Sequence, residues 1–271
     1  PKRSLRTGYP MINLSLLNCA QKQAVTAPDG PMLVIAGAGS GKTRTIVYRL
    51  AWLVNQGLDP CSLLLLTFTR RAAQEMLHRS SQLLERQMLG VQGGTFHSFA
   101  FSVLRHWHPS WTQGNLSIMD TSDSTAAIQA CKESLSIGRG DRSFPKTQAV
   151  LSLLSTARNK ELELEEVLSR EAQHLLPHAS DIIRLGEAYR QYKQEHSLLD
   201  YDDLLFELEQ LFLDRPDLLE IQRERFRHIM VDEYQDTNKV QARIVRLLAG
   251  SGGNIMAVGD DAQSIYAFRG A

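Results

Sequence analysis

The residues best suited to chemistry occupy Ala36–Thr43, with the sequence AGAGSGKT. This run follows a short apolar stretch at residues 32–35 and precedes residues 46–54, where apolar side chains recur at helical spacing. A strand, a glycine-rich turn and a helix form the context in which backbone N–H groups converge on a phosphate. The usual pattern begins with glycine where this chain has alanine, and the alternative is a flexible turn joining a buried strand to a helix. Because Gly-Lys-Thr opens the helical stretch, we favour a phosphate-binding loop.

The loop carries the groups that such a site needs. Gly37, Gly39 and Gly41 allow backbone conformations that other residues rarely adopt, so that successive N–H groups can face one anion. We expect Lys42 to neutralise the β- and γ-phosphates of a nucleotide. The Thr43 hydroxyl is expected to ligate Mg²⁺.

A pair of carboxylates far downstream would complete a nucleotide site. Asp232 and Glu233 directly follow an apolar run at residues 228–231. At the end of a strand, Asp232 is expected to hold Mg²⁺, and Glu233 to orient and deprotonate an attacking water. Adjacent carboxylates are unremarkable alone. Together with the phosphate loop they predict hydrolysis of a nucleoside triphosphate.

Composition places the chain among ordinary globular proteins. Hydrophobic residues make up 43% and charged residues 22% of the 271 residues, a length that allows one large or two modest domains. No stretch approaches about 18 consecutive apolar residues, so a membrane span is not expected. The three cysteines are odd in number and far apart, which favours free thiols in a reducing cytoplasm over disulfides or a metal cluster.

Charge is distributed unevenly along the chain. The net charge is zero, but residues 1–110 carry 12 Lys and Arg against 4 Asp and Glu. A basic region around a phosphate loop fits a polyanionic partner, and it equally fits an ordinary solvated surface. Charge alone therefore does not identify the partner.

Apolar runs and helical stripes predict how these residues are positioned. Short apolar runs typical of buried parallel strands occur at residues 32–35, 63–66, 228–231 and 255–258. Residues 90–94 are a glycine-rich break, and residues 147–224 alternate apolar helical stripes with acidic faces. We therefore predict an α/β fold, a P-loop NTPase domain with a parallel sheet, interrupted by an all-helical insertion.

Six sequence blocks occur in an order that resembles a known family. They are LLNCAQKQAV, AGAGSGKT, LLTFTRRAAQEM, GTFHSFA, VDEYQDTN and VGDDAQSIYAFRGA. Together they resemble the N-terminal half of a UvrD/Rep-type superfamily 1 (SF1A) DNA helicase, from about residue 17 to the last residue. The resemblance implies a RecA-like motor domain, named 1A, at residues 1–106 and 225–271, with the helical subdomain 1B at 107–224.

The resemblance also assigns nucleotide roles. Gln21 matches the glutamine that reads the adenine edge, which suits an amide because it donates and accepts at once. Gln263 matches the glutamine that contacts the γ-phosphate, whereas Gln235 and Asp236 would support this network without a firm individual role. The catalytic set is Lys42, Asp232, Glu233 and Gln263. The nucleotide-binding set is Gln21, Ala36, Gly37, Ala38, Gly39, Ser40, Gly41, Lys42, Thr43 and Arg44, with Thr43 and Asp232 on the metal.

A track for single-stranded DNA follows in the same way. The residues in the matching blocks are Phe68, Thr95, His97, Tyr266, Phe268 and Arg269. Stacking of bases on aromatic side chains gives affinity without sequence preference, about 1–3 kcal/mol per base. The family usually has tryptophan at position 268, where phenylalanine keeps an aromatic face. Arg269 would bond either a phosphate or an internal carboxylate, and Phe96 and Phe99 are expected in the core.

The activity implied is ATP-driven, 3′ to 5′ movement on single-stranded DNA and unwinding at duplex junctions. The sequence stops at Ala271 inside the last block, so we expect a piece of a longer protein. In the family a second motor domain supplies arginines, and arginines of that kind are worth about 10³–10⁵ in rate. The piece alone is therefore expected to be nearly inactive.

Three rival functions were weighed against this one. The motor subunit of a recombination helicase–nuclease shares these blocks and would need a nuclease domain in the longer protein. A nucleotide-gated DNA-binding protein with little hydrolysis would have no reason to retain the whole catalytic set. A small-molecule kinase is disfavoured, because it has no use for DEYQD followed by an aromatic–arginine stretch.

Overall fold

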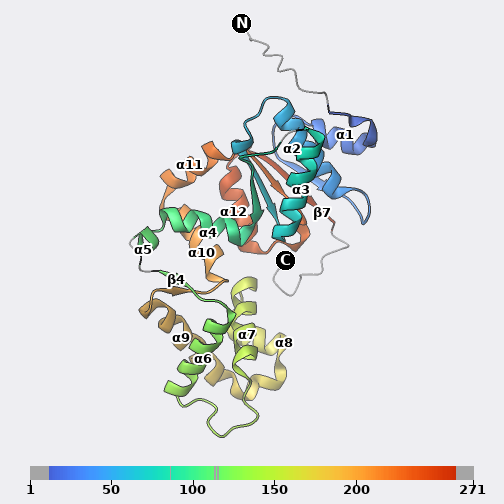
Figure 1. The fold of residues 1–271 in the computed structure, drawn as a ribbon. Coiled ribbons are helices and arrows are strands. Elements are labelled where there is room, and N and C mark those ends of the chain that lie inside the picture. The colour runs from blue at the N-terminus through green and yellow to red at the C-terminus, as the bar shows by residue number, and fades with distance from the viewer. Residues whose placement is uncertain (1–11, 86, 113, 115, 261–271) are drawn as a thin grey trace. The chain divides into compact units, whose positions relative to one another are not determined.

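The computed structural model describes residues 12–260 except residues 86, 113 and 115 (Figure 1). The described chain divides into two compact units. The first, the α/β unit, contains the residues up to Phe99, Phe212–Thr237 and those from Arg243 onward. The second, the helical unit, contains Ala100–Leu211 and Asn238–Ala242. Helices α4 (Phe96–Trp107), α10 (Asp203–Asp214) and α12 (Lys239–Ala249) each run from one unit into the other.

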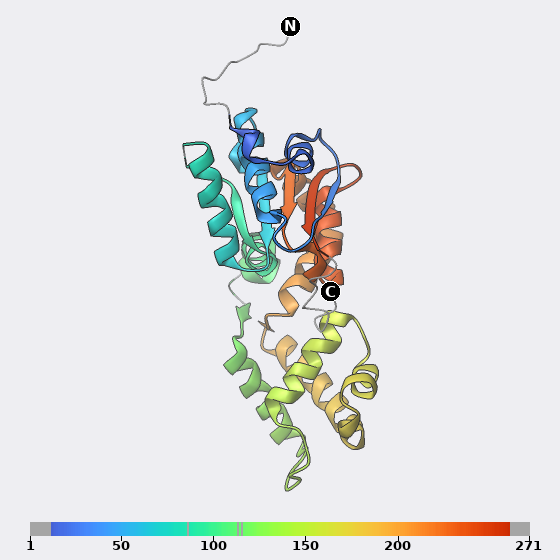
Figure 2. The ribbon, with the colours of Figure 1, turned by 90° about the vertical axis from the view of Figure 1, so that its right-hand side faces the viewer.

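A five-stranded parallel sheet forms the centre of the α/β unit (Figures 1 and 2). Its strand order is β1-β7-β6-β2-β3, and every neighbouring pair is parallel. The strands are β1 (Met32–Ile35), β2 (Leu63–Thr67), β3 (Gln92–Thr95), β6 (His228–Val231) and β7 (Asn254–Gly259). The predicted α/β fold with a parallel sheet is therefore confirmed.

Apolar side chains cover both faces of the central strands, as expected for a parallel sheet between helices. All five residues of β2 are buried, and alternation sends Leu63 and Leu65 into the core beside α2 and α3. Leu64 and Leu66 point to the opposite face and are also buried. The amphipathic helix α12 (Lys239–Ala249) lies on that side, away from α2 and α3 (Figure 1).

The remaining elements of the α/β unit are helices, and several of them begin at a side-chain cap. They are η1 (Leu14–Leu16), α1 (Cys19–Thr26), α2 (Lys42–Asn55), η2 (Pro60–Ser62), α3 (Arg70–Leu83), α11 (Pro216–Arg225) and η4 (Tyr234–Asp236). Asn18 forms a reciprocal capping box with Gln21 at α1, and Thr69 caps α3. Arg49 in α2 is buried and donates to the carbonyls of Val25 and Ala27, which fixes α1 against α2.

Two expectations about the strands were wrong. We expected residues 32–35 to be buried throughout, but Leu33 and Ile35 are 60% and 65% exposed. Strand β1 is an edge strand, and alternation places these two side chains on the face opposite α2. The glycine-rich break at 90–94 contains β3, which pairs with β2 although it has no apolar pattern. Phe96 and Phe99 are buried, as expected.

The helical unit is built on its own apolar core. Its helices are α5 (Pro109–Thr112), α6 (Thr121–Ser134), α7 (Thr147–Lys160), α8 (Leu164–Glu171), η3 (Gln173–His178), α9 (Ala179–Glu195) and α10 (Asp203–Asp214), together with most of α4 (Phe96–Trp107). Ile128, Val150, Leu168, Ile182 and Leu185 are fully buried in one cluster. The unit also contains two short parallel strands, β4 (Ser117–Ile118) and β5 (Leu198–Leu199), which the prediction of an all-helical insertion did not include.

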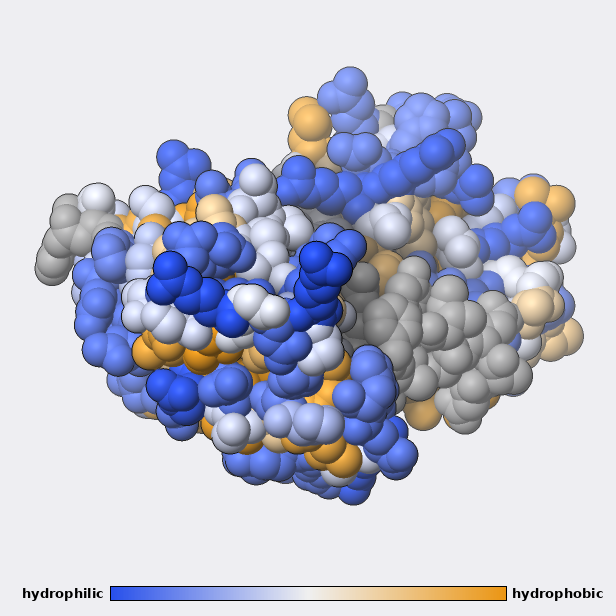
Figure 3. All heavy atoms as spheres, turned by 90° about the horizontal axis from the view of Figure 1, so that it is seen from below, coloured by the Kyte–Doolittle hydropathy of each residue, from blue (hydrophilic) through white to orange (hydrophobic). Residues whose placement is uncertain are grey.

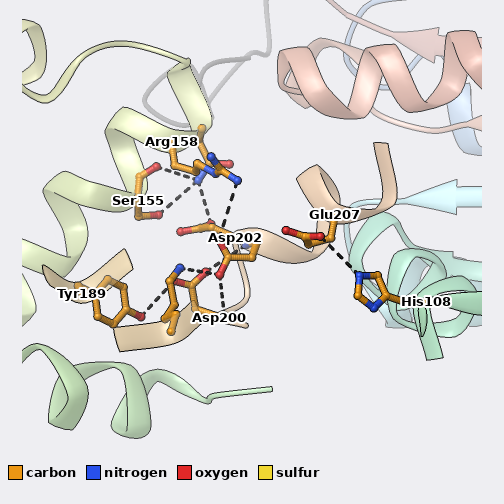
Figure 4. A network of polar contacts seen from close by, with 10 residues as sticks. His108, Ser155, Arg158, Tyr189, Asp200, Asp202 and Glu207 are labelled. Carbon is orange, nitrogen blue, oxygen red and sulfur yellow. Dashed lines mark hydrogen bonds and ion pairs between the residues drawn. The ribbon is translucent and has the colours of Figure 1, made fainter. Parts of the chain in front are cut away.

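A buried ionic network fixes the start of α10 in this unit (Figure 4). The Nζ atom of Lys193 lies 2.6 Å from Asp200 and 2.5 Å from Asp203. The two aspartates also cap each other's backbone N–H groups, and the Tyr189 hydroxyl donates to Asp200. Asn159 donates to Asp202 and accepts from Asn238. The network therefore joins α7, α9 and α10.

Polar and charged side chains dominate one face of the molecule (Figure 3). The face drawn in Figure 3 is mostly hydrophilic, with separate areas of apolar residues between the polar ones. Within residues 12–260, apart from the three gaps, none of the helices has the length and apolar character needed to cross a bilayer.

Candidate functional site

Three neighbouring strands of the sheet end at residues of the candidate nucleotide site. Ala36 follows β1, Asp260 follows β7, and Asp232 follows β6. The registers pair Ile35 with Gly259 and Val231 with Ala257, so the three carboxyl ends lie together. In an open parallel sheet, ligands bind outside these ends. The topology thus brings together segments that are about 200 residues apart in the sequence.

The phosphate loop adopts a conformation that depends on two of its glycines. Gly39 and Gly41 have φ values of +70° and +87°, in the region that other residues avoid. A Cβ atom on Gly41 would also lie 2.6 Å from the Nε2 atom of Gln21. Gly37 does not use a positive φ, contrary to the expectation that all three glycines would need this freedom. Helix α2 starts at Lys42, so its unpaired N–H groups face the loop.

Lys42 is buried at the centre of the site. Its Nζ atom donates to the Ala36 carbonyl at 3.1 Å and lies 3.4 Å from Asp260 Oδ2. Both side chains of this ion pair are less than one-tenth exposed. A phosphate that binds Lys42 therefore has to compete with Asp260 for the ammonium group.

Asp232 has the properties expected of a cation ligand. It is only 6% exposed, and burial and repulsion by Glu233 raise its pKa to about 6, against smaller lowering by a backbone hydrogen bond and by Lys42. Because the Lys42 ammonium group acts on the pKa of Asp232, the two side chains lie within electrostatic reach of each other. The Asp232 Oδ1 atom is buried without a hydrogen-bond partner among the described residues. An unpaired buried carboxylate oxygen fits Mg²⁺, which prefers oxygen ligands.

Glu233 is held in an unusual backbone conformation. Its φ is +50° and its ψ is +48°, which for a non-glycine residue costs of order 1–3 kcal/mol. The Gln235 Nε2 atom donates to Glu233 Oε2 at 2.7 Å, and the Asp236 N–H donates to the Glu233 carbonyl. The Glu233 side chain is half-buried and follows Asp232 directly, a position that is compatible with the predicted base.

Gln21 lies against the phosphate loop. Its Nε2 atom donates to the Ser40 carbonyl at 2.8 Å, and its Oε1 atom accepts from the Asn18 N–H in the capping box. An amide has a second proton and a second lone pair, so one donor and one acceptor position remain for an adenine edge. The predicted role of Gln21 is therefore compatible with its position.

The described part of the predicted DNA track lies at the other side of the sheet. Phe68 follows β2, and Thr95 ends β3 as the register partner of Thr67. The Thr95 Oγ1 atom accepts from the Ser98 N–H and caps α4, where His97 lies in the first turn. Thr95 thus has a local structural role besides the predicted one. Gln263, Tyr266, Phe268 and Arg269 lie outside the described residues.

Two contacts in the site were missed by the sequence reasoning. Asp260 was not assigned a role, although it follows an apolar run as Asp232 does, which was the available signal. Its pairing with Lys42 depends on β7 lying beside β1, and the strand order was not predicted. Gln235 was expected only to support the network. Its contacts with both Glu233 and Asp260 follow from the fold.

Comparisons with known proteins agree with this geometry. Residues 17–271 match the family described as UvrD/REP helicase N-terminal domain. DNA helicase II of Salmonella typhimurium is 38% identical and that of Escherichia coli 37%, each over 260 residues, which are 95% of this chain and 35% of the relative. The ATP-dependent DNA helicase PcrA of Staphylococcus aureus is 35% identical over 260 residues, with the same coverage. This chain spans about a third of the length of these relatives, and it belongs to the UvrD/REP helicase N-terminal domain family.

Proposed function

We propose that this chain is the ATP-binding part of a DNA helicase that couples ATP hydrolysis to 3′ to 5′ movement on single-stranded DNA and to duplex unwinding. The carrying observation is the convergence of Lys42, Asp232 and Asp260 at the carboxyl ends of adjacent parallel strands. Family membership supports the use of ATP and DNA. The chain covers about a third of the length of these relatives, which supports a further motor domain in the full-length protein.

In this proposal the residues of the chain divide the work. The loop N–H groups and Lys42 hold the phosphates, and Thr43 and Asp232 hold Mg²⁺, which would stabilise the charge that develops on the phosphates. Glu233 orients a water and takes its proton. Gln21 reads the adenine, and Gln263 contacts the γ-phosphate.

The domain assignment is part of the same proposal. Residues 1–106 and 225–271 would form motor domain 1A, and 107–224 would form subdomain 1B. Phe68, Thr95, His97, Tyr266, Phe268 and Arg269 would line the single-strand groove of the complete protein. Because the second motor domain supplies further charge stabilisation, hydrolysis by this piece alone would be slow. The free cysteines Cys19, Cys61 and Cys131 are consistent with a reducing cytoplasm.

The test is the ATPase activity of the full-length protein with and without a single-stranded oligonucleotide. We expect stimulation by the oligonucleotide and its loss in Glu233→Gln, because the amide cannot accept a proton from water. Glu224→Gln, which changes an exposed glutamate on α11, is the matched control and should hydrolyse ATP at the wild-type rate. Absence of stimulation would count against a translocase. Unchanged turnover in Glu233→Gln would show that hydrolysis does not use this site.

A further inference from the structure

Gln235 connects the predicted catalytic base to the phosphate loop. Its Nε2 atom donates to Glu233 Oε2 at 2.7 Å and lies 3.5 Å from Asp236 Oδ2, and its Oε1 atom accepts from the Asp260 N–H at 2.9 Å. The Asp260 side chain in turn pairs with Lys42. The Gln235 amide therefore bonds both the carboxylate of Glu233 and the backbone of Asp260, the residue that pairs with Lys42.

The backbone around Gln235 is shaped to accept this arrangement. A Cβ atom on Gly259 would lie 2.7 Å from Gln235 Oε1 and 3.2 Å from the Gln235 nitrogen, so any side chain at that position would displace the amide. Glu233 keeps its left-handed backbone only while its surroundings hold it there. The hydrogen bond from Gln235 is the side-chain contact that fixes the end of the Glu233 side chain.

We propose that Gln235 is a positioning residue, which orients the Glu233 carboxylate toward the attacking water. Through its bond to Asp260, Gln235 also couples this orientation to the Lys42–Asp260 pair. When a phosphate takes Asp260's place on Lys42, Asp260 is released from the ammonium group. Its N–H is bonded to Gln235, so the change reaches Glu233 through two hydrogen bonds. This role rests on the proposed function, because it presupposes that Glu233 acts as the base.

The first experiment compares kcat and KM for ATP in the full-length protein with single-stranded DNA. Gln235→Met preserves the length of the side chain and removes its hydrogen bonds to Glu233, Asp236 and Asp260. We expect kcat to fall about 10- to 100-fold, the scale of a misplaced catalytic group, with KM for ATP changed by less than about threefold. Gln191→Met is the matched control, because it removes a 2.7 Å amide–carboxylate contact on exposed α9 and should leave both constants unchanged.

A second variant changes Gly259, at the end of β7, which lies against the Gln235 amide. Gly259→Ala should also reduce kcat, because the new methyl group meets the Gln235 amide. Thermal unfolding of each variant separates a local displacement from loss of the fold. Fluorescent-nucleotide binding should remain near the wild-type affinity in both.

The deciding measurement places Gln235→Met in the Glu233→Gln background. A residue that acts through Glu233 has nothing left to position there, so the double variant should be no slower than Glu233→Gln alone. The positioning role would be overturned if Gln235→Met lowered kcat by the same factor in the Glu233→Gln background as in wild type. It would also be overturned if Gln235→Met changed only KM. If wild-type protein hydrolyses ATP and Gln235→Met matches it, only this role fails. If wild-type protein does not hydrolyse ATP, or Glu233→Gln matches it, the proposed function fails and the role fails with it.

Discussion

The helical unit contains two ion pairs of equal length that differ in how far they are buried. Comparing them tests whether burial, at a fixed distance, sets the contribution of an ion pair to stability. Lys193 lies 2.5 Å from Asp203, and the side chains of Lys193 and both of its aspartates are 12–13% exposed. Arg170 lies the same 2.5 Å from Glu166, but these side chains are 63% and 38% exposed. Lys193→Met and Arg170→Met therefore remove contacts of equal length in different surroundings.

We expect the loss in free energy of unfolding to be several-fold larger in Lys193→Met than in Arg170→Met. Lys193→Met leaves Asp200 and Asp203 facing each other with Arg158 4.0 Å from Asp203 as a more distant and more exposed cation. Loss of one partner from a buried pair costs about 3–5 kcal/mol. The exposed i,i+4 pair of Arg170 is worth only about 0.3–0.5 kcal/mol. With a urea dependence of about 2 kcal/mol per molar, the midpoint for the helical unit should fall by about 2 M in Lys193→Met and by about 0.2 M in the control.

The loss should also depend on pH. Burial raises the pKa of Asp200, but attraction and a hydrogen bond from Lys193 outweigh it and leave the pKa below its usual value. That contribution is present above about pH 4 and is lost as the pH falls through the folded-state pKa. The difference between wild type and Lys193→Met should therefore shrink as the pH falls below about 4.

The assay is urea denaturation of this chain followed by far-UV circular dichroism and tryptophan fluorescence, with the two units treated as separate transitions. Adding Asp200→Asn and Asp203→Asn to Lys193→Met should recover much of the loss, because asparagine still caps a helix without charge. Equal midpoints for Lys193→Met and Arg170→Met would refute the reasoning, since burial would then have no effect.

Three further variants test the α/β unit. Arg49→Met should cost about 2–3 kcal/mol in urea denaturation, because the Val25 and Ala27 carbonyls lose a charged donor; exposed Arg79→Met is the control and should cost under about 1 kcal/mol. Asn18→Ala should cost about 1 kcal/mol and weaken nucleotide binding by releasing Gln21, whereas Asp120→Ala, a matched cap in the helical unit, should cost as much without affecting nucleotide binding. Burial lowers the pKa of His228 below its usual value, so its contribution is present above about pH 6.5 and is lost as the pH falls; thermal unfolding between about pH 7 and 5 should be less pH-dependent in His228→Gln, and an unchanged slope would contradict this.

The elements predicted best from the sequence are those with strong local signals. The apolar runs predicted β1, β2, β6 and β7, and the phosphate loop indicated that α2 would follow it. Strand β3 was missed because its residues, QGGT, lack any apolar alternation and are fixed by pairing with β2. The two-residue strands β4 and β5 are likewise defined only by their pairing.

The site shows the same division between local and distant information. The types and spacing of Lys42, Asp232 and Glu233 were sufficient to predict a nucleotide site, and the structure brings Lys42 within electrostatic reach of Asp232. The contacts of Asp260 and Gln235 were not predictable, because they require β7 to lie between β1 and β6. The exposure of Leu33 and Ile35 also depends on strand order, which places β1 at an edge.

The order of the strands determines when the sheet can form during synthesis. Among the described strands the first to be made, β1, pairs with the last, β7, so its ladder waits for more than 200 residues to leave the ribosome. Strand β2 gains its partner β3 early, but its other neighbour, β6, is made only after Ala100–Leu211 of the helical unit. The nascent N-terminal segment therefore carries β1 without a partner until β7 has been made, and Leu33 and Ile35 are available to holdase chaperones during that interval.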